Sequence, residues 1–408
     1  MSLTREAGPT KLSPAERLAG QTQRARSEWR RPLLLSLVLV VVLRVVLGLW
    51  AAYVLANFPT TDLARQYAHV GFPLQGGAIA GPWEREDALW YEKIATVGYD
   101  PNDGSTAFLP LFPLVMRAAS LVTLGDIALA GILVSSLAAV AALALLYRLS
   151  TLDGDGETGL RSVLYLALFP TAFFLLSAFT ESLFLALAIG AFWQARHGRW
   201  WLVVPLAALA GLAKVQGALL CVPLGVEYLH QTGWNIGKLR SNILQVAAVV
   251  LSGPLASAAF FAFTRYMIGD RISWSERVTA LWHFKSTWPG ETLATAVGKI
   301  VGEGQFTINA FDLLVLVGFL VLTAGAFRLR PSYGLQPLTA LVPSLLRVNA
   351  DFPLMSLSRY ALVAFPCFIV LAMWTQRRPR MVHLLVLALW ASLLLVWSSQ
   401  SVRGFWVG

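Results

Sequence analysis

Long apolar runs separated by short polar loops dominate this chain. A helix needs about 20 mostly apolar residues to cross the hydrocarbon core of a bilayer. The runs that reach or approach this length are residues 33–56, 126–149, 162–178, 181–196, 200–229, 242–268, 309–328, 333–349, 358–375 and 381–398. The pattern predicts an all-α, polytopic membrane protein.

Basic residues in the loops predict which side each loop faces, because cytoplasmic loops carry an excess of Arg and Lys. A cluster of arginines lies just before the first run, which places the N-terminus in the cytoplasm: Arg24, Arg26, Arg30 and Arg31. Five later loops also carry basic residues: 148–161, 196–199, 238–240, 328–330 and 377–380. Both ends of the run 200–229 are then cytoplasmic, so this run must cross twice, with a break at residues 214–217. We therefore predict about eleven transmembrane helices.

The same alternation predicts the domain organisation. Residues 1–32 form a disordered cytoplasmic tail, 33–398 a single transmembrane domain, and 399–408 an extracytoplasmic tail. Within the domain, residues 57–125 are the first extracytoplasmic loop, and 269–308 are the second. The short apolar stretch 108–124 carries two prolines and an arginine, which favours a helix lying in the membrane interface rather than spanning it.

Composition excludes several function classes. Only 13% of the residues are charged, against about 25% in soluble domains, and the mean hydropathy is +0.63. The net charge of +10 is spread over membrane-flanking loops, so no nucleic-acid partner is implied. Cys221 and Cys367 lie inside apolar runs and predict neither a disulfide nor a metal site. No phosphate-binding or dinucleotide fingerprint and no paired histidines occur, so we expect no cofactor and no metal.

The first long polar loop carries the candidate chemistry. Residues 57–105 contain seven acidic and three basic residues, and the centre of this stretch, residues 83–91, reads WEREDALWY. A chain that only spans the membrane has little use for carboxylates set among Trp and Tyr residues. A membrane enzyme that acts on a sugar does use such residues, so the loop predicts an active site for a glycan substrate.

Several sequence blocks resemble one known family. They are residues 87–99 (DALWYEKIATVGY), 107–114 (AFLPLFPL), 169–170 (FP), 177–184 (SAFTESLF), 213–217 (AKVQG), 358–360 (SRY) and 365–366 (FP). Their order resembles that of the PIG-V family, which comprises the second mannosyltransferase of GPI-anchor assembly and its bacterial relatives. Two positions depart from the family pattern: Glu86 stands where a Trp is usual, and Lys214 where an Arg is common.

The resemblance implies a C-type glycosyltransferase fold and a bacterial plasma-membrane enzyme. Such an enzyme would transfer mannose, with inversion, from polyprenyl-phosphate mannose to an extracytoplasmic glycan or glycolipid acceptor. The lipid-linked sugar would be a substrate rather than a cofactor. Membrane lipids would surround the enzyme, and an accessory membrane subunit is known for eukaryotic members.

Inverting transfer needs a carboxylate that accepts the proton of the acceptor hydroxyl. The resemblance favours Asp87 for this role. The alternative for Asp87 is a helix N-cap before Ala88, since Asp is a favoured cap. Glu181, between two helices on the predicted outer face, could orient the acceptor or position Asp87, or it could be an ordinary turn residue.

The departing lipid phosphate needs cations. Arg359, beside Tyr360 at the predicted outer end of the tenth helix, is the first candidate clamp. Lys214 is the second, and the alternative for it is a snorkelling side chain without a ligand. Three aromatic residues could stack on sugar rings or belong to the interfacial belt: Trp83, Trp90 and Tyr91.

Two other function classes stay open at the level of sequence. A lipid or sugar transporter or flippase predicts inverted repeats and helices interrupted at mid-membrane. A scaffold within a membrane complex predicts no catalytic loss on any single substitution. The acidic cluster on the predicted outer face favours the enzyme.

Overall fold

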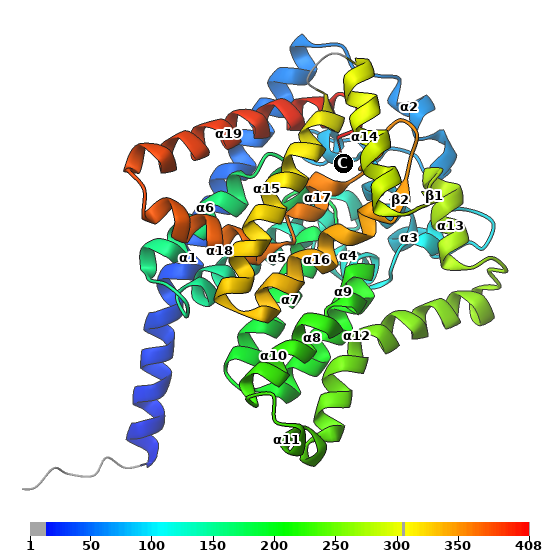
Figure 1. The fold of residues 1–408 in the computed structure, drawn as a ribbon. Coiled ribbons are helices and arrows are strands. Elements are labelled where there is room, and N and C mark those ends of the chain that lie inside the picture. The colour runs from blue at the N-terminus through cyan, green and yellow to red at the C-terminus, as the bar shows by residue number, and fades with distance from the viewer. Residues whose placement is uncertain (1–13, 304–306, 408) are drawn as a thin grey trace, which may run out of the picture.

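The computed structural model describes residues 14–303 and 307–407, which form a helical bundle with one two-stranded antiparallel ribbon (Figure 1). The α-helices are α1 (Pro14–Asn57), α2 (Leu63–Gln66), α3 (Asp87–Val97), α4 (Leu111–Ala119), α5 (Ile127–Ser150), α6 (Gly156–Leu168), α7 (Glu181–Arg196), α8 (Trp200–Ala213), α9 (Val215–Leu219), α10 (Cys221–Gln231), α11 (Ile236–Ser241), α12 (Ile243–Phe263), α13 (Trp274–Trp282), α14 (Pro289–Glu303), α15 (Ile308–Leu329), α16 (Pro331–Leu345), α17 (Leu357–Ala361), α18 (Phe365–Gln376) and α19 (Arg380–Val402). The short turns are η1 (Ala68–Val70), η2 (Gly81–Trp83), η3 (Ser105–Ala107), η4 (Ala172–Leu175) and η5 (Thr264–Ile268), and the strands are β1 (Lys285–Ser286) and β2 (Arg347–Val348).

Among the described residues, five helical stretches are long and apolar enough to cross a membrane: Glu28–Asn57, Ile127–Ser150, Ile243–Ile268, Ile308–Leu329 and Arg380–Val402. The all-α membrane class is therefore confirmed, but the predicted count of eleven spanning helices is not. Two of the predicted runs are interrupted near a proline. Run 162–178 divides at Phe169, where α6 ends ahead of Pro170, and run 358–375 divides between α17 and α18, where Pro366 lies in the first turn of α18. Proline disfavours the helical conformation of the residue before it, and hydropathy does not register that effect.

The loops that carry basic residues gather at one end of the bundle. Arg196, the last residue of α7, pairs with Asp153 at 2.8 Å, and Arg330, before α16, pairs with Glu227 at 2.9 Å. On the other side of the molecule, α2, α13, α14 and the β1–β2 ribbon lie together with the C-terminus (Figure 1). Loops predicted to share a side of the membrane therefore share an end of the fold.

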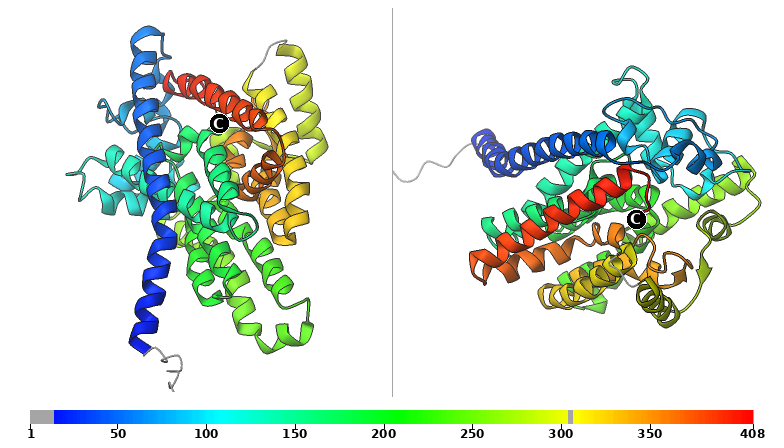
Figure 2. Two further views of the ribbon diagram at one scale, coloured as in Figure 1. Left: turned by 90° about the vertical axis from the view of Figure 1, so that its left-hand side faces the viewer. Right: turned by 90° about the horizontal axis from the view of Figure 1, so that it is seen from above.

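The N-terminal segment differs from the prediction. Residues 14–32, expected to be disordered, belong to α1, a single helix that continues to Asn57. Figure 2 shows this helix running along the edge of the bundle and extending beyond it. Residues 1–13 of the predicted tail lie outside the described residues.

The predicted interfacial helix is shorter than expected. Residues 108–124 contain α4, whose Phe112 and Met116 are fully buried, while Leu114 is 61% exposed. Leu121 and Leu124, which follow α4, are also exposed. This two-sided character fits a helix at the membrane interface.

The predicted break in run 200–229 is confirmed at Lys214. Its backbone is extended between α8 and α9, with φ −155° and ψ 145°. The break depends on close backbone packing, because a Cβ on Gly217 would lie 2.0 Å from the carbonyl oxygen of Ala210. A Cβ on Gly253 of α12 would lie 2.7 Å from the Gly217 carbonyl oxygen. These glycines let α8, α9 and α12 approach closely, and the turn presents the Lys214 side chain to a cavity.

Candidate active site

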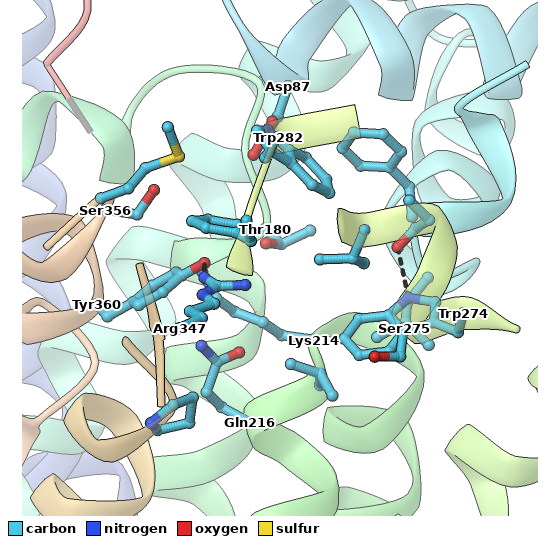
Figure 3. Close-up of a pocket in the computed structure, with 18 of the residues that line it drawn as sticks. Asp87, Thr180, Lys214, Gln216, Trp274, Ser275, Trp282, Arg347, Ser356 and Tyr360 are labelled. Atoms are coloured by element: carbon cyan, nitrogen blue, oxygen red, sulfur yellow. Dashed lines mark hydrogen bonds between the residues drawn. The ribbon is translucent and has the colours of Figure 1, made fainter. Parts of the chain in front are cut away.

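A cavity of about 490 Å³ lies at the end of the bundle that holds the first loop (Figure 3). Its volume falls within the range of small-molecule sites. The charged residues in its wall are Asp87, Lys214, Arg347 and Arg359. They come from α3, the α8–α9 break, β2 and α17, which are distant in sequence.

Asp87 is the carboxylate of the cavity wall. It is the first residue of α3, and Glu86 is the N-cap, so the alternative role of Asp87 as the N-cap is wrong. The helix N-terminus favours a negative charge at this position. The Nη2 group of Arg359 donates a hydrogen bond of 2.7 Å to Oδ2 of Asp87. The carboxylate is thereby fixed through one oxygen while it faces the cavity.

Glu181 lies beneath the cavity rather than in its wall. It is fully buried at the start of α7. Its Oε1 is 2.8 Å from Nε of Arg359 and also binds the ammonium group of Lys214. A single carboxylate therefore binds two cations, so Glu181 is not an ordinary turn residue. Because it is buried outside the cavity wall, it does not reach a substrate in the cavity.

The two predicted clamps, Arg359 and Lys214, carry compensated charges. Arg359 lies in the short helix α17, not at the end of a long spanning helix, and bridges Asp87 and Glu181. Lys214 pairs with Glu181 and lies 4.8 Å from the centre of the Tyr360 ring. The snorkelling alternative for Lys214 is therefore wrong, because its ammonium group points into the protein.

Arg347 is the cation that the sequence analysis missed. It belongs to β2, pairs with Ser286 of β1, and donates a hydrogen bond of 3.0 Å to the Tyr360 hydroxyl. Its guanidinium lies 4.0 Å from the centre of the Phe284 ring. Within residues 14–303 and 307–407 it has no ion pair with an acid. The predicted crossing 333–349 included this position, but α16 ends at Leu345. The signal in the sequence that could have identified Arg347 is a cation at the outer end of an apolar run.

The aromatic wall of the cavity differs from the predicted one. Tyr91 and Tyr360 line it, but Trp83 and Trp90 do not. Trp83 packs near Phe173, and Trp90 stacks on Phe108 with ring centres 5.6 Å apart. The tryptophans that do line the cavity come from α13 and the C-terminal segment: Trp274, Trp282 and Trp406.

The family follows from comparison with known proteins. The model of the family described as Mannosyltransferase (PIG-V) matches residues 78–285, about half of the chain. The chain belongs to this PIG-V mannosyltransferase family. The matched part contains Asp87, Glu181 and Lys214, and it ends before Arg347. No curated protein matches the chain.

One similar solved structure is the oligosaccharyltransferase of Archaeoglobus fulgidus, tethered to an acceptor peptide with an NVT sequon. The identity is 12% and the TM-score is 0.42. The match covers 90% of this chain and 55% of that one, so this PIG-V member spans little more than half of that protein's length.

Membership of the PIG-V mannosyltransferase family and the long apolar helices both favour a membrane glycosyltransferase. This finding favours the enzyme over the transporter and scaffold alternatives. Among the described residues, no group of three His, Cys, Asp or Glu side chains could hold a metal ion.

Glu86 gives this PIG-V member a pH-dependent stability. Burial raises the pKa of its carboxyl group from 4.5 to about 8, with Arg359 opposing and Asp87 adding to the increase. A pKa raised by folding stabilises the protein at low pH, and this contribution is lost as the pH rises towards and through 8. The free energy of unfolding falls by up to about 1.4 kcal/mol per pH unit where Glu86 is ionised in the unfolded protein and protonated in the folded protein.

We therefore expect Glu86→Gln to flatten the fall in stability between about pH 4.5 and pH 8. Thermal unfolding of purified protein across this range measures the effect. The exposed loop residue Asp62 supplies the control Asp62→Asn, which should retain the wild-type slope. Equal slopes for Glu86→Gln and wild type would contradict the assignment.

Proposed function

We propose that this enzyme transfers mannose from polyprenyl-phosphate mannose to a hydroxyl group of an extracytoplasmic acceptor, with inversion at the anomeric carbon. The observation that carries the proposal is the pairing of one anchored carboxylate with one uncompensated cation in a single cavity. Asp87 is the carboxylate and Arg347 is the cation. Family membership supports mannose as the sugar.

In the proposed reaction, the acceptor oxygen forms a bond to the anomeric carbon as the bond from that carbon to the phosphate oxygen breaks. The acceptor proton passes to Asp87, and the electron pair of the broken bond leaves with the polyprenyl phosphate. Oδ1 of Asp87 takes this proton, because Oδ2 already accepts a hydrogen bond from Arg359. A base that is held in one orientation avoids reorganisation during the reaction.

The leaving phosphate gains negative charge, so it binds most favourably to a cation without an acidic partner. Arg359 and Lys214 share Glu181, and Arg359 also binds Asp87. Arg347 contacts only neutral groups among its described partners, Tyr360 and Phe284. A single cation without an acidic partner is suited to binding a donor that has one phosphate group. Pro343 and Leu346, close to Arg347 in sequence, supply apolar wall for the first part of the lipid chain.

The orientation is part of the proposal. The loops predicted to be cytoplasmic, such as those carrying Arg196 and Arg330, share an end of the bundle away from the cavity, and cytoplasmic loops carry an excess of basic residues. The cavity would then open on the extracytoplasmic face of a bacterial plasma membrane. A transferase there needs a donor whose sugar is already on that face, which a polyprenyl carrier supplies.

A donor screen tests the proposal. Purified protein in lipid is given polyprenyl-phosphate mannose, glucose or arabinose together with a membrane acceptor extract. We expect release of polyprenyl phosphate from the mannose donor alone, and a product with the opposite anomeric configuration. Turnover of none of the donors, or retention of configuration, would overturn the proposal. A flippase would move the lipid without releasing polyprenyl phosphate.

Arg347→Met should lower kcat/KM for the donor about 10- to 100-fold, because a charge-assisted hydrogen bond contributes about 1.5–3 kcal/mol. Donor titration in the same assay measures the effect, and inhibition by added polyprenyl phosphate should weaken in parallel. The matched control is Lys285→Met. Lys285 lies on the other strand of the same ribbon, its side chain is 73% exposed, and it does not line the cavity. Equal losses in both variants would refute a specific phosphate contact.

A further inference from the structure

The turn that carries Asp87 has a strained backbone. Glu86, which precedes it, has φ 52° and ψ −125°, a region that side chains other than glycine rarely adopt. Such a conformation is unfavourable on its own and persists only where the surroundings hold it. Since α3 begins at Asp87, this turn sets the direction in which the carboxylate points.

Two contacts hold the turn, and both come from the far end of the chain. The guanidinium of Arg85 donates hydrogen bonds of 3.2 Å and 2.8 Å to the carbonyl oxygen of Val402. The backbone N–H of Val407 lies near the carboxyl group of Glu86 and acts to lower its pKa, against the larger effect of burial. Arg85 and Glu86 are 4% and 9% exposed, so neither contact competes with bulk water.

The C-terminal segment, defined as residues 403–407, is itself anchored on the first loop. Backbone N–H of Thr61 donates to the Arg403 carbonyl oxygen at 2.9 Å, and Nε2 of Gln66 donates to the Gly404 carbonyl oxygen at 2.9 Å. Gly404 has φ 90°, and a Cβ there would lie 2.1 Å from Oγ1 of Thr61. The segment is therefore fitted to the loop.

Trp406 of this segment reaches the cavity. It lines the wall together with Asp87, and its ring centre is 5.9 Å from that of Phe352. Val407, the next residue, is completely buried. The same short segment thus touches both the turn before Asp87 and the space that Asp87 faces.

We infer that the C-terminal segment is a positioning element of the active site: it holds the strained Arg85–Glu86–Asp87 turn through Val407 and closes the cavity with Trp406. The inference rests on the proposed function for Asp87 as the base. Releasing the segment would let the turn relax and the carboxylate swing away from the acceptor, while Arg347 would still bind the donor. The rate of the chemical step would fall more than donor binding.

Val407→Pro and Val407→Ala form the test pair in the full-length protein. Proline removes the N–H that lies near the Glu86 carboxyl group, whereas alanine keeps it and removes two methyl groups. We expect kcat to fall about 10- to 100-fold in Val407→Pro, because displacement of a reacting group by about 1 Å costs a factor of this size. Donor KM should stay within about threefold of wild type, and Val407→Ala should keep most of the activity.

Trp406→Ala is the second variant, in case proline at position 407 prevents folding. It should lower activity, and Trp406→Phe should restore most of it by keeping an aromatic wall. Phe405→Ala is the matched control from the same segment, because its side chain is 44% exposed and its ring contact is with Arg403 alone among the described residues. Equal losses in Phe405→Ala and Trp406→Ala would overturn the inference.

Hydrogen–deuterium exchange gives a readout that needs no substrate. Amides of residues 86–92 should exchange faster in Val407→Pro than in Val407→Ala or wild type. Unchanged exchange together with unchanged kcat would overturn the positioning role. If wild type turns over none of the donors, the proposed function fails, but the exchange experiment still decides whether the C-terminal segment holds the turn.

Discussion

Asp87→Asn should reduce mannose transfer about 10²- to 10⁴-fold, the usual contribution of a general base. Asparagine is nearly isosteric with aspartate, and its side-chain oxygen can still accept the hydrogen bond from Arg359. The variant should therefore retain the arrangement of the cavity but lose the group that accepts the acceptor proton. Release of polyprenyl phosphate under saturating donor measures the loss in kcat.

The control for this variant is Asp62→Asn. Asp62 is an exposed acid in the same first loop, where it caps α2, and it does not line the cavity. It should keep wild-type kcat, and donor KM should change little in either variant. An Asp87→Asn enzyme with full kcat would remove Asp87 from the role of base, whatever its position in the cavity.

Much of the fold could be predicted from periodicity and charge alone. Apolar runs located the helices, and basic loops correctly grouped segments that share an end of the bundle, such as those carrying Arg196 and Arg330. Local conformational effects decided where helices end. Proline shortened the helix before Pro170, and glycine packing around Gly217 produced the break that the charge pattern required.

The candidate site was predictable only in part. Sequence blocks singled out Asp87, Lys214 and Arg359, but their contacts join residues up to 272 positions apart. Nothing in a local pattern tells which acid pairs with which cation. Arg347 was missed because its hydropathic surroundings resemble a membrane span, although the residue lies in an irregular ribbon next to the cavity.

The tryptophans of the cavity wall could not be predicted from local sequence either. Trp83 and Trp90 were candidates because they flank the acids in sequence, yet a helix turns successive side chains in different directions. Their rings pack into the protein while Tyr91, one residue after Trp90, faces the cavity. Trp406, more than three hundred positions away, takes part in the wall that the nearby tryptophans were expected to form.

Glu181→Gln should lower both the stability and the activity of the enzyme, and this is the second large effect that we expect. The substitution removes the charge that Lys214 and Arg359 share, so that Lys214 is left without an acidic partner and Arg359 keeps only Asp87. Breaking a buried ion pair by removing one partner destabilises a protein by about 3–5 kcal/mol. Activity should fall as well, because Arg359 would no longer be held in the orientation that fixes Oδ2 of Asp87. Thermal unfolding and donor turnover measure the two effects separately.

A second substitution separates charge compensation from positioning. Lys214→Met in the Glu181→Gln background removes the cation that has lost its acidic partner, so it should recover a substantial part of the lost stability. Stability should return without full activity, because Arg359 still lacks its Glu181 partner and the cavity has lost one cation. If the double variant is no more stable than Glu181→Gln alone, the loss of stability does not come from the uncompensated charge of Lys214. Glu181 then stabilises the fold by packing.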